Sequence, residues 1–90
     1  MVYILKFQQP LGNARHQAKY YMGYCEEGRL DERLKEHRSG KGAAITRAAH
    51  ERGIAFEVVL RLEGFTRQDE RRLKNWKNYR RVIKRYGGRV

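Results

Sequence analysis

A chain of 90 residues can enclose only one thin hydrophobic core, because a chain of this size buries only about 60–65% of the surface that it exposes when unfolded. Hydrophobic residues make up 40% of the sequence and recur periodically, which is enough for such a core. We therefore expect a single domain over residues 1–90, since domains usually need roughly 100–200 residues each.

The cysteine usage and the N-terminal segment bear on the compartment. A lone cysteine, Cys25, cannot form an internal disulfide or a zinc cluster, and it suggests a reducing environment. The apolar segment 1–7 is too short for a signal peptide or a membrane-spanning helix. We expect a cytoplasmic protein with no membrane partner.

Short apolar segments alternate along the chain with breaks rich in glycine. Three segments have the β-branched, aromatic composition of strands, and three others have helical spacing. The predicted strands are 2–7, 20–25 and 54–62. The predicted helices are 30–38, 43–52 and 66–86. If the last helix is broken, the break is expected near Asn75. This order, β-β-α-α-β-α, predicts an α+β fold with a small, mostly antiparallel three-stranded sheet flanked by helices.

Several local signals refine this outline. Pro10 and the glycine after it predict a long loop over 8–18 between the first two strands. Gly23 inside a strand predicts a bulge, or a position where another group approaches the backbone closely. Thr66 and Asp69 resemble a capping box at the start of the last helix.

Apolar spacing predicts which side chains face the core. In the third strand, one face is predicted to hold Phe56, Val58, Leu60 and Leu62. In the last helix, the predicted core stripe is Leu73, Trp76, Tyr79 or Arg80, Ile83 and Tyr86.

The net charge of +11 is distributed unevenly. Residues from Phe65 onward carry +8, whereas the first sixty-four carry +3. A phosphate backbone is the partner that uses such an asymmetry, since each neutralised phosphate releases counterions. A solubilising tail or an anionic membrane surface are the alternatives. The predicted nucleic-acid contacts are Lys41, Arg47, Lys74, Lys77, Arg80, Arg81, Lys84 and Arg85.

Two residues of the first helix have side chains suited to phosphate chemistry. Arg33 and His37 are four positions apart and therefore share a face. An arginine can hold a phosphate while a histidine moves a proton. The alternative, which the spacing alone favours, is a solvated surface on which the charge of His37 suits the helix C-terminus.

Tyrosines are concentrated on the first two predicted strands, which are expected to be neighbours: Tyr3 lies on the first, and Tyr20, Tyr21 and Tyr24 lie on the second. Alternation places Tyr20 and Tyr21 on opposite faces of their strand. A pair of phenols across two strands is able to accept a proton and to bind a phosphate. The alternative, favoured by the strand context, is cross-strand aromatic packing.

Glu70 is a carboxylate near the start of a helix dominated by arginine and lysine. Magnesium on nucleic acid commonly takes one or two carboxylates and keeps its waters. The alternative is a partner for the dipole of the helix N-terminus.

Taken in their order along the sequence, these strands, helices and side chains resemble the GIY-YIG nuclease family along nearly the whole chain. Met1-Val2-Tyr3 stands at the first triplet, which keeps only its tyrosine, and Tyr21-Met22-Gly23 stands at the second. The segment 33–43 resembles the family's arginine–histidine–glycine helix, and it is the most specific match. Glu70-Arg71-Arg72-Leu73-Lys74 is similar to the helix with the metal carboxylate, and Lys77-Asn78 to the Lys-Asn that often follows.

This resemblance implies a metal-dependent endonuclease that hydrolyses DNA phosphodiester bonds and nicks one strand per active site. Glu70 would hold one Mg²⁺ or Mn²⁺ ion, and Arg33 would stabilise the negative charge that develops on the phosphate. Tyr3 or Tyr21 would take the proton of the attacking water, and His37 would accept or relay it. Asn78 would position the last helix or a phosphate.

Two other functions stay open. One is a non-catalytic, basic nucleic-acid-binding module that keeps the nuclease fold. The other is a basic subunit that binds an acidic protein. The expected partner is duplex or branched DNA, with RNA also open, and specificity would come from a homodimer or a larger protein complex.

Overall fold

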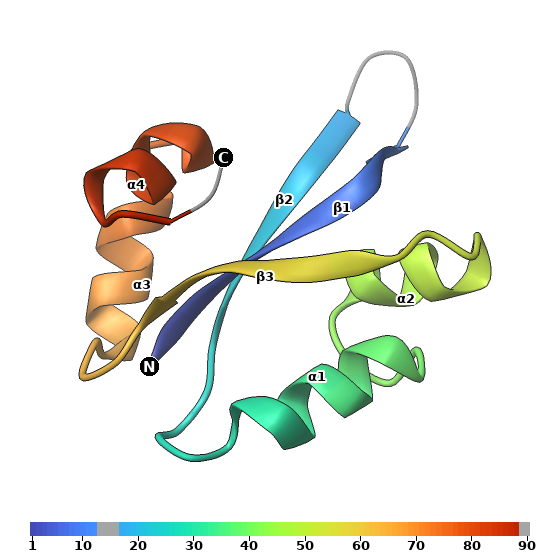
Figure 1. Cartoon of the computed structure of the whole chain (residues 1–90), viewed down its shortest axis with the longest axis horizontal. Helices are drawn as coiled ribbons and strands as arrows, with labels where there is room; N and C mark the ends of the chain where they lie inside the picture. Colours follow the sequence, from blue (N-terminus) through green and yellow to red (C-terminus); the bar gives the residue numbers. More distant parts are fainter. Residues whose placement is uncertain (13–16, 89–90) are drawn as a thin grey trace.

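Strand β1 (Val2–Gly12) runs through the middle of the molecule and pairs with β2 (Gln17–Tyr24) on one side and β3 (Phe56–Leu62) on the other (Figure 1). The structure is a computed structural model that describes residues 1–12 and 17–88. Both strand pairings are antiparallel. The predicted α+β fold with a three-stranded antiparallel sheet flanked by helices is therefore confirmed.

Two pairs of helices cover opposite faces of this sheet (Figure 1). Helices α1 (Leu30–Arg38) and α2 (Ala44–Glu51) pack on one face. Helices α3 (Arg67–Lys74) and α4 (Tyr79–Arg85) pack on the other. The sheet is thus the middle layer of three.

The central strand contributes side chains to both cores. Val2 and Ile4 pack with the apolar residues of α3 and α4. Tyr3 and Leu5 point to the opposite face and pack with those of α1. All four have no exposed surface, which explains why this segment is apolar at nearly every position.

The loop predicted over 8–18 is wrong in its described part. Strand β1 continues to Gly12 and β2 already begins at Gln17, while residues 13–16 lie outside the described residues. The register between β1 and β2 shifts between Lys6 and Leu11. Pro10 lies within this irregular stretch. Proline has no backbone N–H to donate, and the regular hydrogen-bond ladder is interrupted there.

A second register shift divides the side chains of β3 between the two cores. It lies between Ile4 and Leu5 of β1. A one-residue shift moves the following side chains to the other face of a sheet. Residues 56 and 58 therefore pack on the α1–α2 side, and residues 60 and 62 on the α3–α4 side. The prediction that these four share one face is wrong.

The single basic helix predicted over 66–86 is in fact two helices, α3 and α4. The chain turns at Lys77, whose φ of 54° is incompatible with a continuing helix. Asn78 then caps α4, because its side chain accepts a hydrogen bond from the Arg81 backbone N–H at 3.1 Å. The capping box predicted at α3 is confirmed, with Thr66 and Asp69 bonded reciprocally.

This break changes the core stripe predicted for the C-terminal segment. Leu73 and Ile83 are buried as expected. Trp76 lies in the connection between α3 and α4 and keeps 37% of its surface exposed, whereas Val82 is fully buried. In the part of the chain that the structure describes, no helix is long and apolar enough to cross a lipid bilayer.

The cap of α4 yields a stability prediction. Asn78→Ala should lower the free energy of unfolding by about 1 kcal/mol, because an N–H of the first turn loses its acceptor. Urea denaturation followed by circular dichroism measures this. Asn78→Ser, whose side chain also caps, should lose much less, and an equal loss in both variants would contradict the capping role.

Candidate active site

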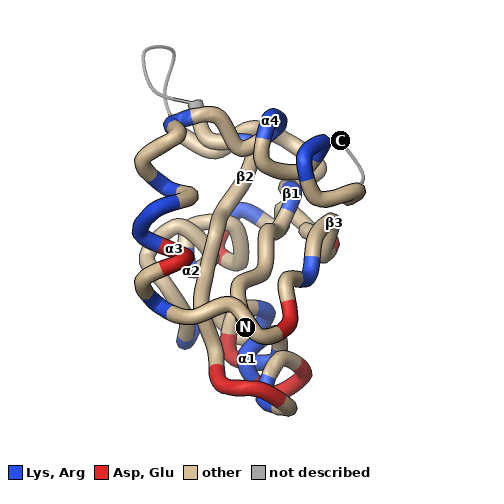
Figure 2. Tube along the Cα trace, turned by 90° about the vertical axis from the view of Figure 1, so that its left-hand side faces the viewer, with Lys and Arg blue, Asp and Glu red and all other residues tan. Residues whose placement is uncertain are grey.

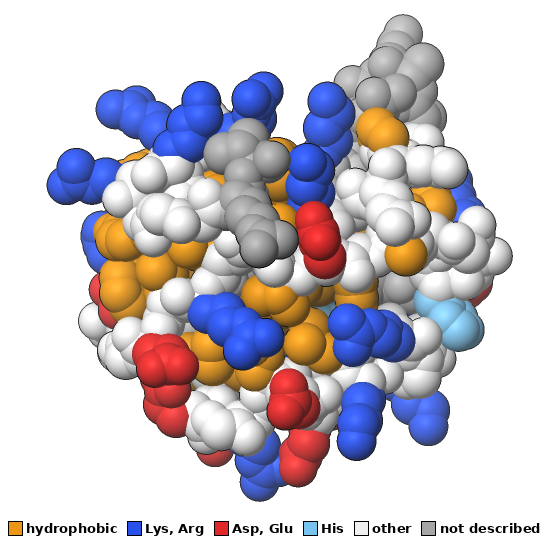
Figure 3. All heavy atoms as spheres, viewed as in Figure 1, with side chains coloured by type: hydrophobic (Ala, Val, Ile, Leu, Met, Phe, Trp, Pro, Cys, Tyr) orange, Lys and Arg blue, Asp and Glu red, His pale blue; other side chains and the backbone are white. Residues whose placement is uncertain are grey.

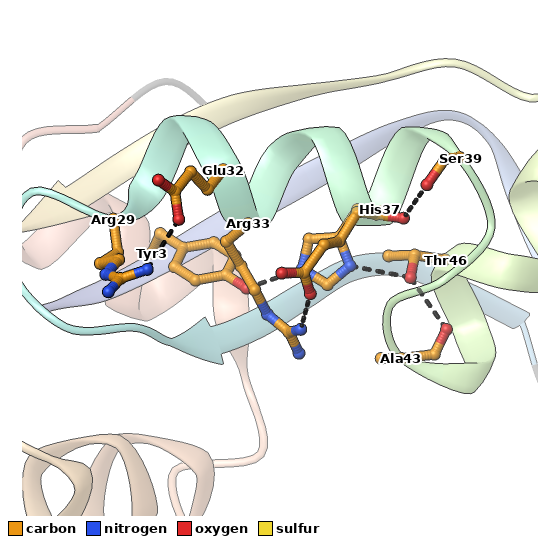
Figure 4. A network of polar contacts seen from close by, with 9 residues as sticks. Tyr3, Arg29, Glu32, Arg33, His37, Ser39, Ala43 and Thr46 are labelled. Carbon is orange, nitrogen blue, oxygen red and sulfur yellow. Dashed lines mark hydrogen bonds and ion pairs between the residues drawn. The ribbon is translucent and has the colours of Figure 1, made fainter.

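The sheet and α1 bring three of the predicted site residues together in the interior. Tyr3 and Tyr21 face α1 from neighbouring strands, and His37 faces them from α1. The Tyr3 hydroxyl oxygen lies 2.7 Å from His37 Nε2 (Figure 4). The ring centres of Tyr21 and His37 are 5.4 Å apart, in an edge-to-face arrangement. His37 is 1% exposed, so the expectation from spacing alone that it lies on a solvated surface is wrong.

The hydrogen bonds around His37 fix where its proton sits. The Thr46 hydroxyl donates to the Ala43 carbonyl at 2.8 Å, so its oxygen accepts at its second contact, with His37 Nδ1 at 2.9 Å (Figure 4). Nδ1 therefore carries the ring proton of neutral His37. It follows that Nε2 is the acceptor and that Tyr3 donates to it.

Two glycines make room for this cluster. A Cβ atom at Gly23 would lie 2.5 Å from the Tyr3 hydroxyl oxygen, and one at Gly42 would lie 2.2 Å from His37 Nδ1. Both distances are shorter than any van der Waals contact, so neither position tolerates a side chain while the rings stay in place. The close approach predicted at Gly23 is confirmed, and the approaching group is the Tyr3 hydroxyl.

Burial decides the resting protonation of the Tyr3–His37 pair. Burial raises the pKa of Tyr3 well above its ordinary value, the neighbouring Tyr21 adds to the rise, and the Arg33 guanidinium opposes it. Burial and, to a smaller extent, the charge of Arg33 together lower the pKa of His37 to about 4, while the charge of Glu36 opposes the shift. At neutral pH the phenol is therefore protonated and His37 is a neutral imidazole that can accept its proton.

Arg33 lies one turn before His37 on the same face of α1. Its guanidinium Nη1 is 2.7 Å from Glu36 Oε2. The two side chains are 32% and 50% exposed, so this ion pair is weak and an incoming phosphate is able to compete for the guanidinium. Arg33 thus combines electrostatic influence on Tyr3 with partial access to solvent.

Glu70 lies on α3, which packs on the face of the sheet opposite α1, and among the described residues no hydrogen bond or ion pair joins it to the Tyr3–His37 pair. Its side chain is 16% exposed, and its Oε2 lies 3.5 Å from Lys74 Nζ. Burial raises the pKa of Tyr79, Lys74 opposes the rise, and both Glu70 and Tyr21 add to it. Tyr79 is therefore close enough to both Glu70 and Tyr21 for their charges to affect its pKa.

The donor set around Glu70 fits a divalent ion only in part. Among the described residues there is no group of three or more His, Cys, Asp or Glu side chains placed to hold a metal. A single carboxylate suits Mg²⁺, which commonly keeps most of its waters and binds substrate phosphates. Glu70 is therefore suited to a divalent ion that it would bind together with the phosphate of the substrate.

The basic residues predicted to contact nucleic acid divide between two faces. Lys41 follows α1 and Arg47 lies on α2, whereas the other six belong to α3, α4 and their connection. All eight are exposed. Figure 2 shows lysine and arginine along α3 and α4, and Figure 3 shows them gathered over α4, with acidic residues along the opposite edge near the start of α1. Asn78 lies at the N-terminus of α4 as its cap.

Sequence reasoning missed three residues of the site. Thr46, which is 1% exposed and orients His37, carries no sequence signal beyond its place in a helix. Gly42 lies in the segment that resembles the nuclease helix, but its contact with His37 follows only from the fold. Tyr79 was expected simply as a core residue.

Comparisons with known proteins leave the family open. No family model, curated protein or solved structure matches this chain.

The depressed pKa of His37 makes stability depend on pH. The unfolded chain binds a proton at His37 near pH 6.5, whereas the folded protein does so only near pH 4. As the pH falls from 6.5 to 4, protonation of His37 in the unfolded chain favours unfolding. The free energy of unfolding should therefore decrease by up to about 3 kcal/mol over this range. Above about pH 7 this contribution is constant.

NMR of the histidine ring nitrogens separates this effect from carboxylate titration. At pH 5, His37 should still be neutral, with its proton on Nδ1. Thr46→Val should destabilise the fold by about 1–3 kcal/mol and change the tautomer ratio, while Thr46→Ser should do neither. A His37 ring that becomes protonated near pH 6.5 would contradict the burial argument.

Proposed function

We propose that this chain is a divalent-metal-dependent endonuclease that hydrolyses DNA phosphodiester bonds, one strand per active site. The observation that supports this most is the short Tyr3–His37 hydrogen bond, in which a phenol has a neutral imidazole behind it as proton acceptor. Tyr21 and Arg33 lie beside the pair, as the resemblance to the GIY-YIG nucleases implies.

The proton relay runs from solvent to the interior. Tyr3 Oη takes a proton from the attacking water while its own proton passes to His37 Nε2. The hydroxide oxygen forms the new bond to phosphorus, and the bond to the leaving sugar oxygen breaks. Because the two transfers are coupled, no free phenolate has to form, which matters for a phenol whose pKa burial has raised. Thr46 keeps its bond to the imidazolium that results.

Arg33 has two tasks in this proposal. A phosphate that replaces Glu36 as its partner draws the guanidinium toward the substrate and uncovers the Tyr3 hydroxyl. The guanidinium then stabilises the negative charge that develops on the phosphate.

Glu70 would hold the divalent ion together with phosphate oxygens, and the bound ion supplies Lewis-acid stabilisation of the leaving oxygen. Lys74 releases the carboxylate for this purpose and remains available to a neighbouring phosphate.

Nicking of supercoiled plasmid in Mg²⁺ tests the proposal. Tyr3→Phe should lower the nicking rate by about 100-fold or more, because the relay loses its oxygen. Glu70→Gln should abolish nicking. Tyr20→Phe, on the other face of β2, and Glu51→Gln, an exposed carboxylate on α2, are matched controls that should keep the wild-type rate.

Unchanged nicking in Tyr3→Phe or Glu70→Gln, with circular dichroism spectra like the wild type, would overturn the assignment of these residues. Absence of nicking by the wild-type protein would overturn the proposed activity itself.

A second candidate function is a nucleic-acid-binding module without cleavage. The observation that favours it is that the Tyr3 side chain has no exposed surface and that its hydroxyl is already bonded to His37. In that case the polar cluster is a structural feature of the core. Plasmid binding that weakens linearly with log salt, with no nicked product in Mg²⁺ or Mn²⁺, would favour this function.

A further inference from the structure

The connection between α3 and α4 exposes a large aromatic ring in the middle of a basic surface. Trp76, the only tryptophan of the chain, is 37% exposed and is the only large hydrophobic side chain that the described residues expose to this degree. Its position follows from the break in the helix, where Lys77 turns the chain. The indole is therefore only partly buried, and part of its surface is open to a ligand.

The surroundings of this ring carry cations and aromatic groups. A groove of about 510 Å³ contains Trp76, and none of the described residues that line it is acidic. Its other lining residues are Arg72, Arg81, Lys84, Arg85 and Tyr86. The Arg81 guanidinium carbon lies 5.8 Å from the centre of the indole, which keeps a cation beside the aromatic face. We name this site the Trp76 groove.

The Tyr86 end of the groove is fixed in place. The Tyr86 ring packs edge-to-face on Phe65, with ring centres 5.5 Å apart. Arg72 pairs with Asp69 at 3.3 Å, an exposed ion pair that a phosphate is able to replace. The Trp76 groove therefore has one fixed aromatic end and a cation that remains available to a ligand.

We propose that the Trp76 groove binds unpaired bases of nucleic acid, with the indole stacking on a base and the flanking cations contacting phosphates. Aromatic side chains in basic grooves bind single strands in this way, because every base has a π-face and every linkage a negative charge. In a duplex both faces of each base are covered by its neighbours, so an exposed indole can stack only on a base that is unpaired or flipped.

This inference rests on the proposed function in that it names a substrate feature recognised by the α3–α4 layer, on the face of the sheet opposite the Tyr3–His37 pair. The substrate would then be DNA with a single-stranded segment, such as a flap, a gap or a branched junction. Continuous duplex would bind through phosphate contacts alone.

Tryptophan fluorescence provides the direct test, because Trp76 is the only emitter of its kind. Oligothymidylate of 15 nucleotides should quench the emission, whereas a duplex of the same length should quench it little. Labelled-oligonucleotide anisotropy then compares affinities. Trp76→Leu should bind oligothymidylate about 5- to 100-fold more weakly, Trp76→Phe should lose much less, and duplex affinity should change less than about twofold.

Charge-matched variants test the phosphate contacts. Arg81→Gln should weaken binding of oligothymidylate and reduce its salt dependence, while Arg61→Gln, an exposed arginine on β3, should do neither. The exposed positions of Trp76 and Arg81 keep the fold intact, which circular dichroism checks.

Four outcomes would overturn the inference: equal oligothymidylate affinity in Trp76→Leu and wild type, no quenching by oligothymidylate, equal quenching by polyglutamate, or a Trp76-dependent dimer seen by light scattering. Plasmid nicking by the same variants is scored separately. No quenching by oligothymidylate in a wild-type protein that nicks plasmid rejects only the Trp76 groove, and quenching by a wild-type protein that does not nick rejects only the nuclease.

Discussion

The central strand β1 is the constraint on which the rest of the molecule depends. Because both of its faces are covered, alternate side chains must serve two different cores. Val2 and Ile4 hold α3 and α4 against one face, while Tyr3 and Leu5 hold α1 against the other. A thin core of this kind has no spare layer, so a polar side chain in residues 2–5 of β1, where both faces are covered, is buried and must find its partner within the fold.

The Tyr3–His37–Thr46 chain satisfies that requirement. Each hydroxyl and ring nitrogen in it has a partner, and the last donor ends on the Ala43 carbonyl. Among the described residues, no buried side-chain polar atom lacks a hydrogen bond. Gly42 provides the space for the ring, so a backbone position without a side chain is as necessary to the cluster as its polar groups. The same contacts that stabilise the core also give the phenol a defined proton acceptor.

Charge is organised separately from this cluster. On α1, ion pairs such as Arg33–Glu36 balance most of the charge, whereas α3 and α4 carry a large excess of cations. The division between α3 and α4 at Lys77 gives this basic surface its shape and places Trp76 within it. Proton transfer is thus proposed for the layer that holds α1, and metal binding by Glu70 and contact with the nucleic-acid backbone are proposed for the layer of α3 and α4.

The sequence by itself determined what depends on near neighbours. Apolar spacing and caps defined the sheet class, α1 and the start of α3, since these signals act over a few residues. Only the tertiary structure decided the register shift of β3, the burial of His37 and the exposure of Trp76. His37 meets a partner 34 positions away, and which residue of β1 lies opposite it depends on strand register and helix docking. No local pattern encodes strand register or helix docking, because both are set only when the helices pack against the two faces of β1.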